Sequence, residues 1–180
     1  KYAYLATGFG IVVVDLVRME IHDTWRPGPG AASNEVFDIT FGNNKVYAAT
    51  INGVWLADLT NPGLAYFGNW NQITSLPEPD SRCTHLIFSG ETLYCNISQG
   101  SEGDKIYSIN GGTRLFSSNP GVINSSFDPA PQGFLVSSAA SLTYFKSDGS
   151  LLKVISTYGW GIPDISQGII IVNDIWLADN

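Results

Sequence analysis

Positive charge is scarce in this chain. Its 180 residues include only nine Lys and Arg against sixteen Asp and Glu, for a formal net charge of -7 at pH 7. The few cations are spread along the sequence and form no basic stripe that could neutralise a phosphate backbone or an anionic membrane surface. The composition therefore argues against a nucleic acid as partner.

Long apolar runs are also missing. No segment approaches the roughly 20 residues that a membrane-spanning helix requires. The chain begins at Lys1 and Tyr2 in strand-like sequence, without the apolar core of a signal peptide. We expect no direct membrane insertion and, if the protein is exported, a processed or trimmed chain.

Cysteine is nearly absent. Cys83 and Cys95 lie twelve positions apart, without a CxxC pair or a histidine at ligand spacing, so we expect no metal site. Two interpretations stay open: two small buried side chains, which is the usual state of cysteine, or a disulfide across one hairpin in an oxidising compartment. The expected hairpin register places the pair slightly off directly opposite positions, which favours buried thiols.

Strand-forming and turn-forming residues are abundant instead. Eight Tyr, nine Phe and five Trp stand beside 19 Gly and 9 Pro, with 14% charged residues. Aromatic and β-branched residues favour strands, while glycine and proline favour tight turns. The composition predicts an all-β protein.

A repeated hairpin organises the sequence. Residues 4–15 and 46–58 each have a β-rich run, then Thr-x-x-Gly, then a second β-rich run that ends at an aspartate. Such a turn places glycine where a positive φ is needed. Degenerate copies are expected over 93–109, 133–145 and 168–179, and residues 175–179 nearly repeat 54–58.

Two further strands flank most hairpins, which predicts a four-stranded unit. One precedes the hairpin, at 36–41, 84–88, 123–127 and 162–166. A more polar one follows it, at 20–25, 70–74, 113–116 and 151–157. Units of this length are typical of β-propeller blades. An immunoglobulin-like sandwich would not repeat such a unit, and β-helix coils are much shorter.

The sequence thus predicts one β-propeller domain over 1–180, a partial ring of about four to five blades of four-stranded antiparallel sheet, incomplete at both ends. The expected pieces are a partial blade at 1–25, blades at 36–75, 84–117 and 123–157, and a partial blade at 159–180. We expect an arc of a larger ring rather than a small closed ring, within a longer chain. An open arc leaves sheet surface that needs a partner.

Three of these segments carry a family resemblance. Residues 4–16 (YLATGFGIVVVDL), 20–25 (EIHDTW) and 46–55 (VYAATINGVW) resemble the first propeller of the PorZ-like surface proteins of Bacteroidetes. They are also similar to the sensor propellers of hybrid two-component regulators. The resemblance to this family extends over residues 2–75, and the later residues resemble propeller blades only in general. It implies an exported, surface-associated protein with two propellers and a C-terminal sorting domain, acting in the attachment machinery of type IX secretion.

Catalytic patterns are hard to find. His22 and His85 lie in expected strands, with no nucleophile or carboxylate arranged beside them in a known motif. Asp15, Asp58 and Asp179 recur at one place in successive units, which favours a structural hydrogen-bonding role. We therefore expect no enzyme and no cofactor.

Loops between second and third strands converge at one mouth of a propeller, where such proteins commonly bind. The loop at 98–104 breaks the pattern because it is longer and acidic. It is either a solvated insertion or a site for a partner or a cation. The candidate partner-binding residues in these loops are Phe9, Asn52, Gln99, Ser101, Glu102 and Asp104.

The functional hypothesis is a non-enzymatic interaction module in the periplasm or at the cell surface of a Gram-negative bacterium. Its partner would be a protein or a cell-surface glycan within type IX secretion or envelope attachment, and the remainder of its own polypeptide or a second copy could cover the open blades. The alternative is a ligand-sensing periplasmic propeller of a hybrid two-component regulator. A glycan-active enzyme on a propeller scaffold would need paired carboxylates at the mouth and is the least favoured hypothesis.

Overall fold

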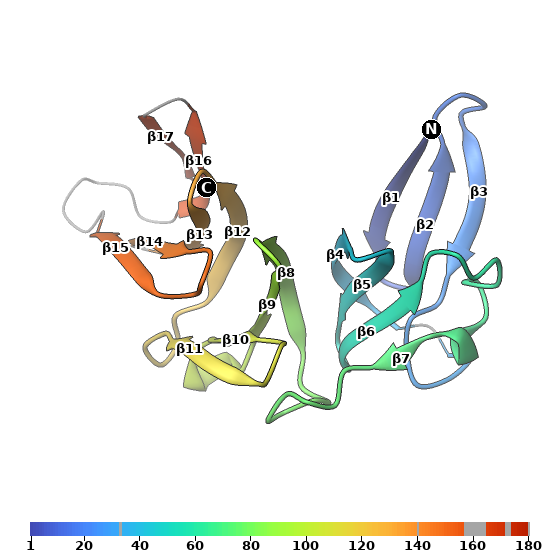
Figure 1. Ribbon diagram of the computed structural model, residues 1–180, viewed down its shortest axis with the longest axis horizontal. Coiled ribbons are helices and arrows are strands. Elements are labelled where there is room, and N and C mark those ends of the chain that lie inside the picture. The colour runs from blue at the N-terminus through green and yellow to red at the C-terminus, as the bar shows by residue number, and fades with distance from the viewer. Residues whose placement is uncertain (33, 140, 157–164, 172–173, 180) are drawn as a thin grey trace. The chain divides into compact units, whose positions relative to one another are not determined.

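A computed structural model describes residues 1–180 except 33, 140, 157–164, 172–173 and 180. The described chain is all β, with its strands joined in five antiparallel sheets and only two short 3₁₀ helices between them (Figure 1). Within these residues no helix has the length and apolar character needed to cross a membrane. The predicted fold class, an all-β protein built from the antiparallel blade sheets of a β-propeller, is confirmed.

The first compact unit, residues 1–86, contains one incomplete and one complete sheet. The three-stranded sheet is made of β1 (Tyr2–Thr7), β2 (Gly10–Asp15) and β3 (Glu20–Trp25). The four-stranded sheet is made of β4 (Val36–Gly42), β5 (Lys45–Thr50), β6 (Gly53–Asp58) and the two-residue β7 (Asn71–Gln72), with the helix η1 (Phe67–Asn69) before β7.

The second compact unit begins inside β8 (Cys83–Ser89) and extends over residues 87–180. Strand β8 is the edge of a sheet with β9 (Thr92–Ile97), β10 (Lys105–Ser108) and β11 (Thr113–Ser117), and η2 (Gly100–Glu102) lies between β9 and β10. The next sheet is β12 (Asn124–Ala130), β13 (Gly133–Ser138), β14 (Ser141–Lys146) and β15 (Leu151–Ser156). The last has two strands, β16 (Ile165–Ile171) and β17 (Asp174–Asp179).

The Thr-x-x-Gly hairpins have the expected geometry. Thr50 pairs with Gly53 across the β5–β6 turn, and its Oγ1 donates to the Gly53 carbonyl oxygen at 2.9 Å. Thr7 and Gly10 repeat this at 2.8 Å. Both glycines have a positive φ, +136° at Gly10 and +91° at Gly53, a conformation that side-chain-bearing residues rarely adopt. In the degenerate β13–β14 copy, serines at 138 and 141 take the same two places.

The last hairpin differs from the prediction. Strands β4 and β12 are the first strands of their blades, and each shifts register against the second strand, β5 or β13, just after the first residue pair. Strand β16 shows the same shift against β17, between Ile165 and Gln167. Strands β16 and β17 are therefore the first and second strands of a blade, and the expected Thr-x-x-Gly hairpin at 168–179 is wrong. Residues 175–179 resemble 54–58 because alternating apolar residues encode a strand but not its place in the blade.

Two consequences follow for residues near this hairpin. Asp179 pairs with Ile165, as Thr50 pairs with Val36, so Asp179 does not share the position of Asp15 and Asp58. The separate strand expected at 162–166 lies partly outside the described residues.

Each unit has its own core. In the first, Ile11, Val13 and Trp25 pack against apolar residues of β5 and β6. In the second, the Tyr94 ring lies 4.8 Å from that of Phe134, which stacks on Phe145 at 5.2 Å. Aromatic side chains bury large areas, so such pairs contribute strongly to the contact between neighbouring sheets.

The cysteines and tryptophans are mostly interior residues. Cys83 and Cys95 are fully buried thiols that no disulfide joins, and Cys83 Sγ is directed at the His85 carbonyl oxygen at 3.6 Å. The disulfide alternative is therefore corrected in favour of two buried side chains. Trp25, Trp55 and Trp70 are buried, whereas Trp176 is exposed and Trp160 lies outside the described residues.

Candidate functional site

Two of the six predicted binding residues lie in hairpin turns of the first unit. Phe9, in the β1–β2 turn, is about half exposed and its amide donates weakly to Thr7 Oγ1. Asn52, in the β5–β6 turn, is exposed, yet its Nδ2 donates to Asn34 Oδ1 at 3.1 Å and its carbonyl accepts from Trp55 Nε1 at 3.0 Å. The turn at Asn52 is thus held in one geometry by its neighbours.

The other four lie in the longer loop of the second unit, residues 98–104. Gln99 Oε1 accepts a hydrogen bond from Lys105 Nζ at 2.7 Å. Ser101 and Glu102 are exposed on the 3₁₀ helix η2. These three are available to a partner at the surface of this loop. The two turn residues of the first unit and this loop belong to separate compact units.

Asp104 occupies a different environment and corrects one prediction. Its side chain is 0% exposed, and its Oδ2 accepts from Asn96 Nδ2 at 2.7 Å and from the Asn124 amide at 2.9 Å. Asn124 Nδ2 in turn donates to Asn96 Oδ1 at 2.8 Å. This buried network links β9 to β12, so Asp104 cannot contact a partner directly. Its hydrogen bonds hold the end of the loop against β9 and β12.

One oxygen of this network has no partner. Asp104 Oδ1 is buried and accepts no hydrogen bond within the described residues. Leaving a carboxylate oxygen unpaired in an interior is costly. Across the described part of the chain, no group of three His, Cys, Asp or Glu residues is placed to hold a metal ion.

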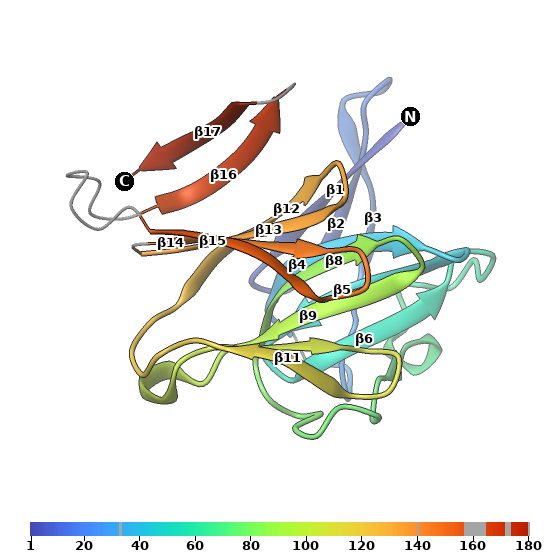
Figure 2. The ribbon, with the colours of Figure 1, turned by 60° about the vertical axis from the view of Figure 1, so that its left-hand side comes forward.

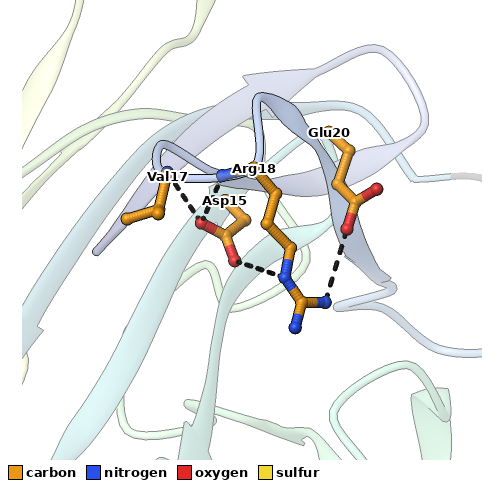
Figure 3. Close-up of polar contacts among 4 residues, drawn as sticks. All are labelled: Asp15, Val17, Arg18 and Glu20. Carbon is orange, nitrogen blue, oxygen red and sulfur yellow. Dashed lines mark hydrogen bonds and ion pairs between the residues drawn. The ribbon is translucent and has the colours of Figure 1, made fainter.

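The recurring aspartates close turns, as their repetition predicts. Asp15 Oδ1 accepts from the amides of Val17 at 2.8 Å and Arg18 at 3.2 Å after β2 (Figure 3). Arg18 lies between Asp15 and Glu20 and makes an exposed ion pair with each. Asp58 accepts from both the amide and the hydroxyl of Thr60 after β6, and Asp148 accepts from the Ser150 amide in the turn after β14.

These contacts set the acidity of the carboxyls. The Thr60 hydroxyl and amide lower the pKa of Asp58 below its ordinary value of 3.8, and the Val17 and Arg18 amides lower the pKa of Asp15 in the same way. Asp38, on β4, shows the opposite shift. Burial raises its pKa, although the Leu86 and Ile39 amides and the charge of His85 act against the rise.

We expect carbon-detected NMR titration of the carboxyl groups to find the midpoint of Asp58 below 3.8 and that of Asp38 above it. Because the folded-state pKa of Asp58 is lowered, this carboxyl stabilises the fold at pH values above its unfolded-state pKa, and the stabilisation is lost as the pH falls through the folded-state pKa. Because the pKa of Asp38 is raised, its contribution to stability is present at low pH and is lost as the pH rises through the folded-state pKa. Thr60→Val should move the Asp58 midpoint upward and leave Asp15 unchanged. An Asp58 midpoint above that of Asp38 would contradict these environments.

A surface hollow in the first unit was not predicted from the sequence. It has a volume of about 370 Å³ and is lined by Tyr4, His22, Asp23 and Trp25 and by four residues after β6: Leu59, Asn61, Pro62 and Leu64. Asp23 Oδ2 accepts from Trp25 Nε1 at 2.9 Å, and Tyr4 lies 5.3 Å from the Trp25 ring. His22 and Asp23 are adjacent in sequence, but the loop that completes the hollow follows β6, so no local pattern joins them.

The chain is similar to known propellers. Residues 1–71 match the family described as the N-terminal β-propeller domain of PorZ from type IX secretion. The structure of PorZ of Porphyromonas gingivalis, an essential bacterial surface component of that system, superposes on 98% of this chain and 22% of its own with a TM-score of 0.70 and 18% identity. No curated protein sequence matches the chain.

Other solved structures share the fold at similarly low identity. The extracellular domain assigned to a hybrid two-component system of B. thetaiotaomicron matches 99% of this chain and 24% of its own, with a TM-score of 0.67 and 14% identity. The enzyme dihydro-heme d1 dehydrogenase NirN matches 98% of this chain and 39% of its own, at a TM-score of 0.62 and 13% identity. The chain thus spans about a quarter of the length of the first of these and less than half of the second.

At these identities the solved structures establish the fold alone. The family match rests on the sequence and covers residues 1–71, which form most of the first two sheets. The family resemblance predicted from the sequence is therefore confirmed, because residues 1–71 match the PorZ N-terminal β-propeller domain.

Proposed function

We propose that this chain is part of a non-enzymatic interaction propeller that acts outside the cytoplasm in type IX secretion. The observation that carries the proposal is the match of residues 1–71 to the PorZ N-terminal propeller domain. The partner would be a protein or a cell-surface glycan. The low positive charge of the chain makes a nucleic acid a poor candidate.

The contact residues in this proposal are exposed or half-buried side chains on hydrogen-bonded turns. Phe9 and Asn52 serve in the first unit, and Gln99, Ser101 and Glu102 serve in the second. Turns that are already held by hydrogen bonds, as at Asn52, bind with a smaller loss of conformational entropy than mobile loops. Asp104 is a support residue rather than a contact in this scheme.

The proposal of a non-catalytic role is supported by how the carboxylates are used. Asp15, Asp58 and Asp148 each accept hydrogen bonds from backbone amides of their own turns. Carboxylates bound in this way are weak bases, because the donated hydrogen bonds lower their pKa. The propeller fold does carry enzymes, as NirN illustrates, so the activity must be argued from the site.

A ligand-sensing propeller is the second candidate. It is favoured by the likeness of nearly the whole chain to the extracellular domain assigned to a hybrid two-component system. The two candidates differ in their consequence for the cell: one affects the fate of secreted proteins, the other the transcription of a gene set.

Deletion of the gene in the source cells tests the proposal. We expect type IX cargo proteins to be lost from the cell surface, and expression of the intact gene in trans to restore them. Surface proteomics measures the cargo, and RNA sequencing of the same cultures measures the response. Unchanged cargo with an altered gene set would replace the proposal by the sensing role.

A further inference from the structure

The hollow beside β1 in the first unit brings together side chains that are far apart in the sequence. Tyr4 of β1 pairs with Val13 of β2, which in turn pairs with Asp23 of β3 (Figure 2). Directly opposite residues of paired strands share one face of the sheet, so Tyr4 and Asp23 point to the same side. The loop after β6 lines the hollow with Asn61 and Pro62.

His22 lines the same hollow because β3 contains a bulge. The residues on either side of it, Ile21 and Asp23, pair with adjacent residues of β2, so His22 is the extra residue. Neighbouring residues of a regular strand face opposite sides, whereas a bulge can turn one of them to the other side. Both His22 and Asp23 therefore contribute to the wall of the hollow.

The carboxylate of Asp23 is held in one orientation. Its Oδ1 accepts from the Thr24 amide at 2.7 Å, and its Oδ2 accepts from Trp25 Nε1 at 2.9 Å. Trp25 is buried, which fixes the indole donor, and Asp23 itself is half-buried. A carboxylate oxygen can accept more than one hydrogen bond, so Asp23 can still bind a donor that enters the hollow.

No cation of the described residues neutralises Asp23. The hollow is lined by no Lys or Arg. Arg18, on the turn between β2 and β3, makes its ion pairs with Asp15 and Glu20 instead. A carboxylate binds a cationic donor more strongly than a neutral one, and the chain as a whole has a net charge of -7. The hollow therefore fits a cation that another molecule supplies.

The remaining walls favour a flat cation with an apolar stem. Leu59 and Pro62 are exposed apolar residues of the loop, and the half-buried Tyr4 ring lines the same hollow. The loop is ordered by its own hydrogen bonds, since Asn61 Oδ1 accepts from the Gly63 amide at 2.8 Å. A guanidinium group is planar, stacks on aromatic rings and donates to carboxylates through a fixed fork.

We propose that this hollow binds an arginine side chain of a partner polypeptide. The guanidinium group donates to the Asp23 carboxylate and stacks on the Tyr4 ring, while the apolar stem of the arginine packs against Pro62. The inference rests on the proposed function, because it names the chemistry by which a protein partner is recognised.

A hollow of the second unit serves as an internal comparison. It has a volume of about 480 Å³, and its lining includes Tyr94, which is the third residue of β9 as Tyr4 is of β1, and Asp148. The Tyr94 side chain is buried, however, and its hydroxyl donates to the Ser147 carbonyl oxygen at 2.9 Å. This hollow has a carboxylate but presents no aromatic ring, so we expect it not to bind arginine.

NMR titration of the 180-residue chain with N-acetyl-arginine amide tests the site. We expect saturable shifts of the Trp25 indole N–H and the Asp23 amide, and none at Asp148. The citrulline analogue, a neutral isostere of the probe, should bind about tenfold more weakly or less well still. Asp23→Asn should weaken arginine binding by about tenfold, whereas Asp148→Asn, with the same change in net charge, should leave it unchanged.

Two variants at the exposed His22 test the site without disturbing the interior. His22→Lys should weaken arginine binding about threefold, because it adds a like charge beside the ligand, and His22→Gln should have a smaller effect. Absence of shifts at millimolar arginine amide would overturn the inference, as would equal binding of the citrulline analogue.

The site and the proposed function can fail separately. If arginine amide does not bind but deletion of the gene still removes cargo from the cell surface, only the arginine site is wrong. If arginine amide binds as expected but the cargo is unchanged, the site stands and the role in secretion is wrong.

Discussion

Gly53→Ala is expected to lower the free energy of unfolding of the first unit by about 3 kcal/mol. A Cβ at this position would collide with the carbonyl oxygen of Pro79. Because that oxygen belongs to the backbone, only a shift of the backbone could relieve the collision. Gly53 also has a φ of +91°, which an alanine adopts only with strain. The substitution therefore combines overpacking with backbone strain at one residue.

Gly8→Ala is the matched control, because Gly8 lies in the equivalent turn after β1. A Cβ there would have nothing within 4 Å. We expect the free energy of unfolding to stay unchanged or to rise by up to about 1 kcal/mol, since alanine restricts the unfolded chain. Urea unfolding followed by tryptophan fluorescence reports on this unit, where Trp25, Trp55 and Trp70 are buried. Equal effects of the two substitutions would contradict the turn geometry.

Asp104→Ala is the second substitution with a large expected effect, a loss of about 3 kcal/mol in the second unit. It removes the acceptor of the Asn96 side chain and of the Asn124 amide, both of which are buried. Buried donors without an acceptor carry the full cost of their desolvation.

Two neighbouring variants separate this structural role from a role in binding. Asp104→Asn should lower the free energy of unfolding less than Asp104→Ala does, because the new side-chain oxygen can take the place of Oδ2 and accept from both Asn96 and Asn124. Glu102→Ala, two residues away on exposed η2, should change the unfolding free energy by no more than about 0.5 kcal/mol. Thermal unfolding by circular dichroism measures all three. If Glu102→Ala proved as destabilising as Asp104→Ala, the assignment of the network would be wrong.

Most of the blade architecture could be predicted from local patterns. The geometry of a Thr-x-x-Gly turn is set within four residues, because the threonine hydroxyl donates across the turn and the glycine adopts the positive φ. The hairpins at Thr7 and Thr50 were predicted for that reason. The last hairpin was assigned to the wrong place in its blade. Whether Trp176 lies on a second or a third strand depends on the register shift at Ile165, which no local pattern encodes.

The candidate site was less predictable than the fold. Phe9, Asn52, Gln99, Ser101 and Glu102 are surface residues in the expected turns, as loop sequence indicates. Asp104 was grouped with them because an acidic residue in a polar loop is normally exposed. Its burial depends on Asn96 and Asn124, eight and twenty positions away, and on the packing of β9 beside β12. Tertiary contacts of this kind leave no periodic signal.

The central claim, that β1 has the place of a second blade strand but is paired on one side only, is tested most directly by amide hydrogen exchange. In dilute protein, residues 2–7 should exchange about tenfold faster or more than residues 45–50, because β5 pairs on both sides and β1 on one side only. Equal protection of the two strands would show that β1 is already paired on both sides and would contradict the account.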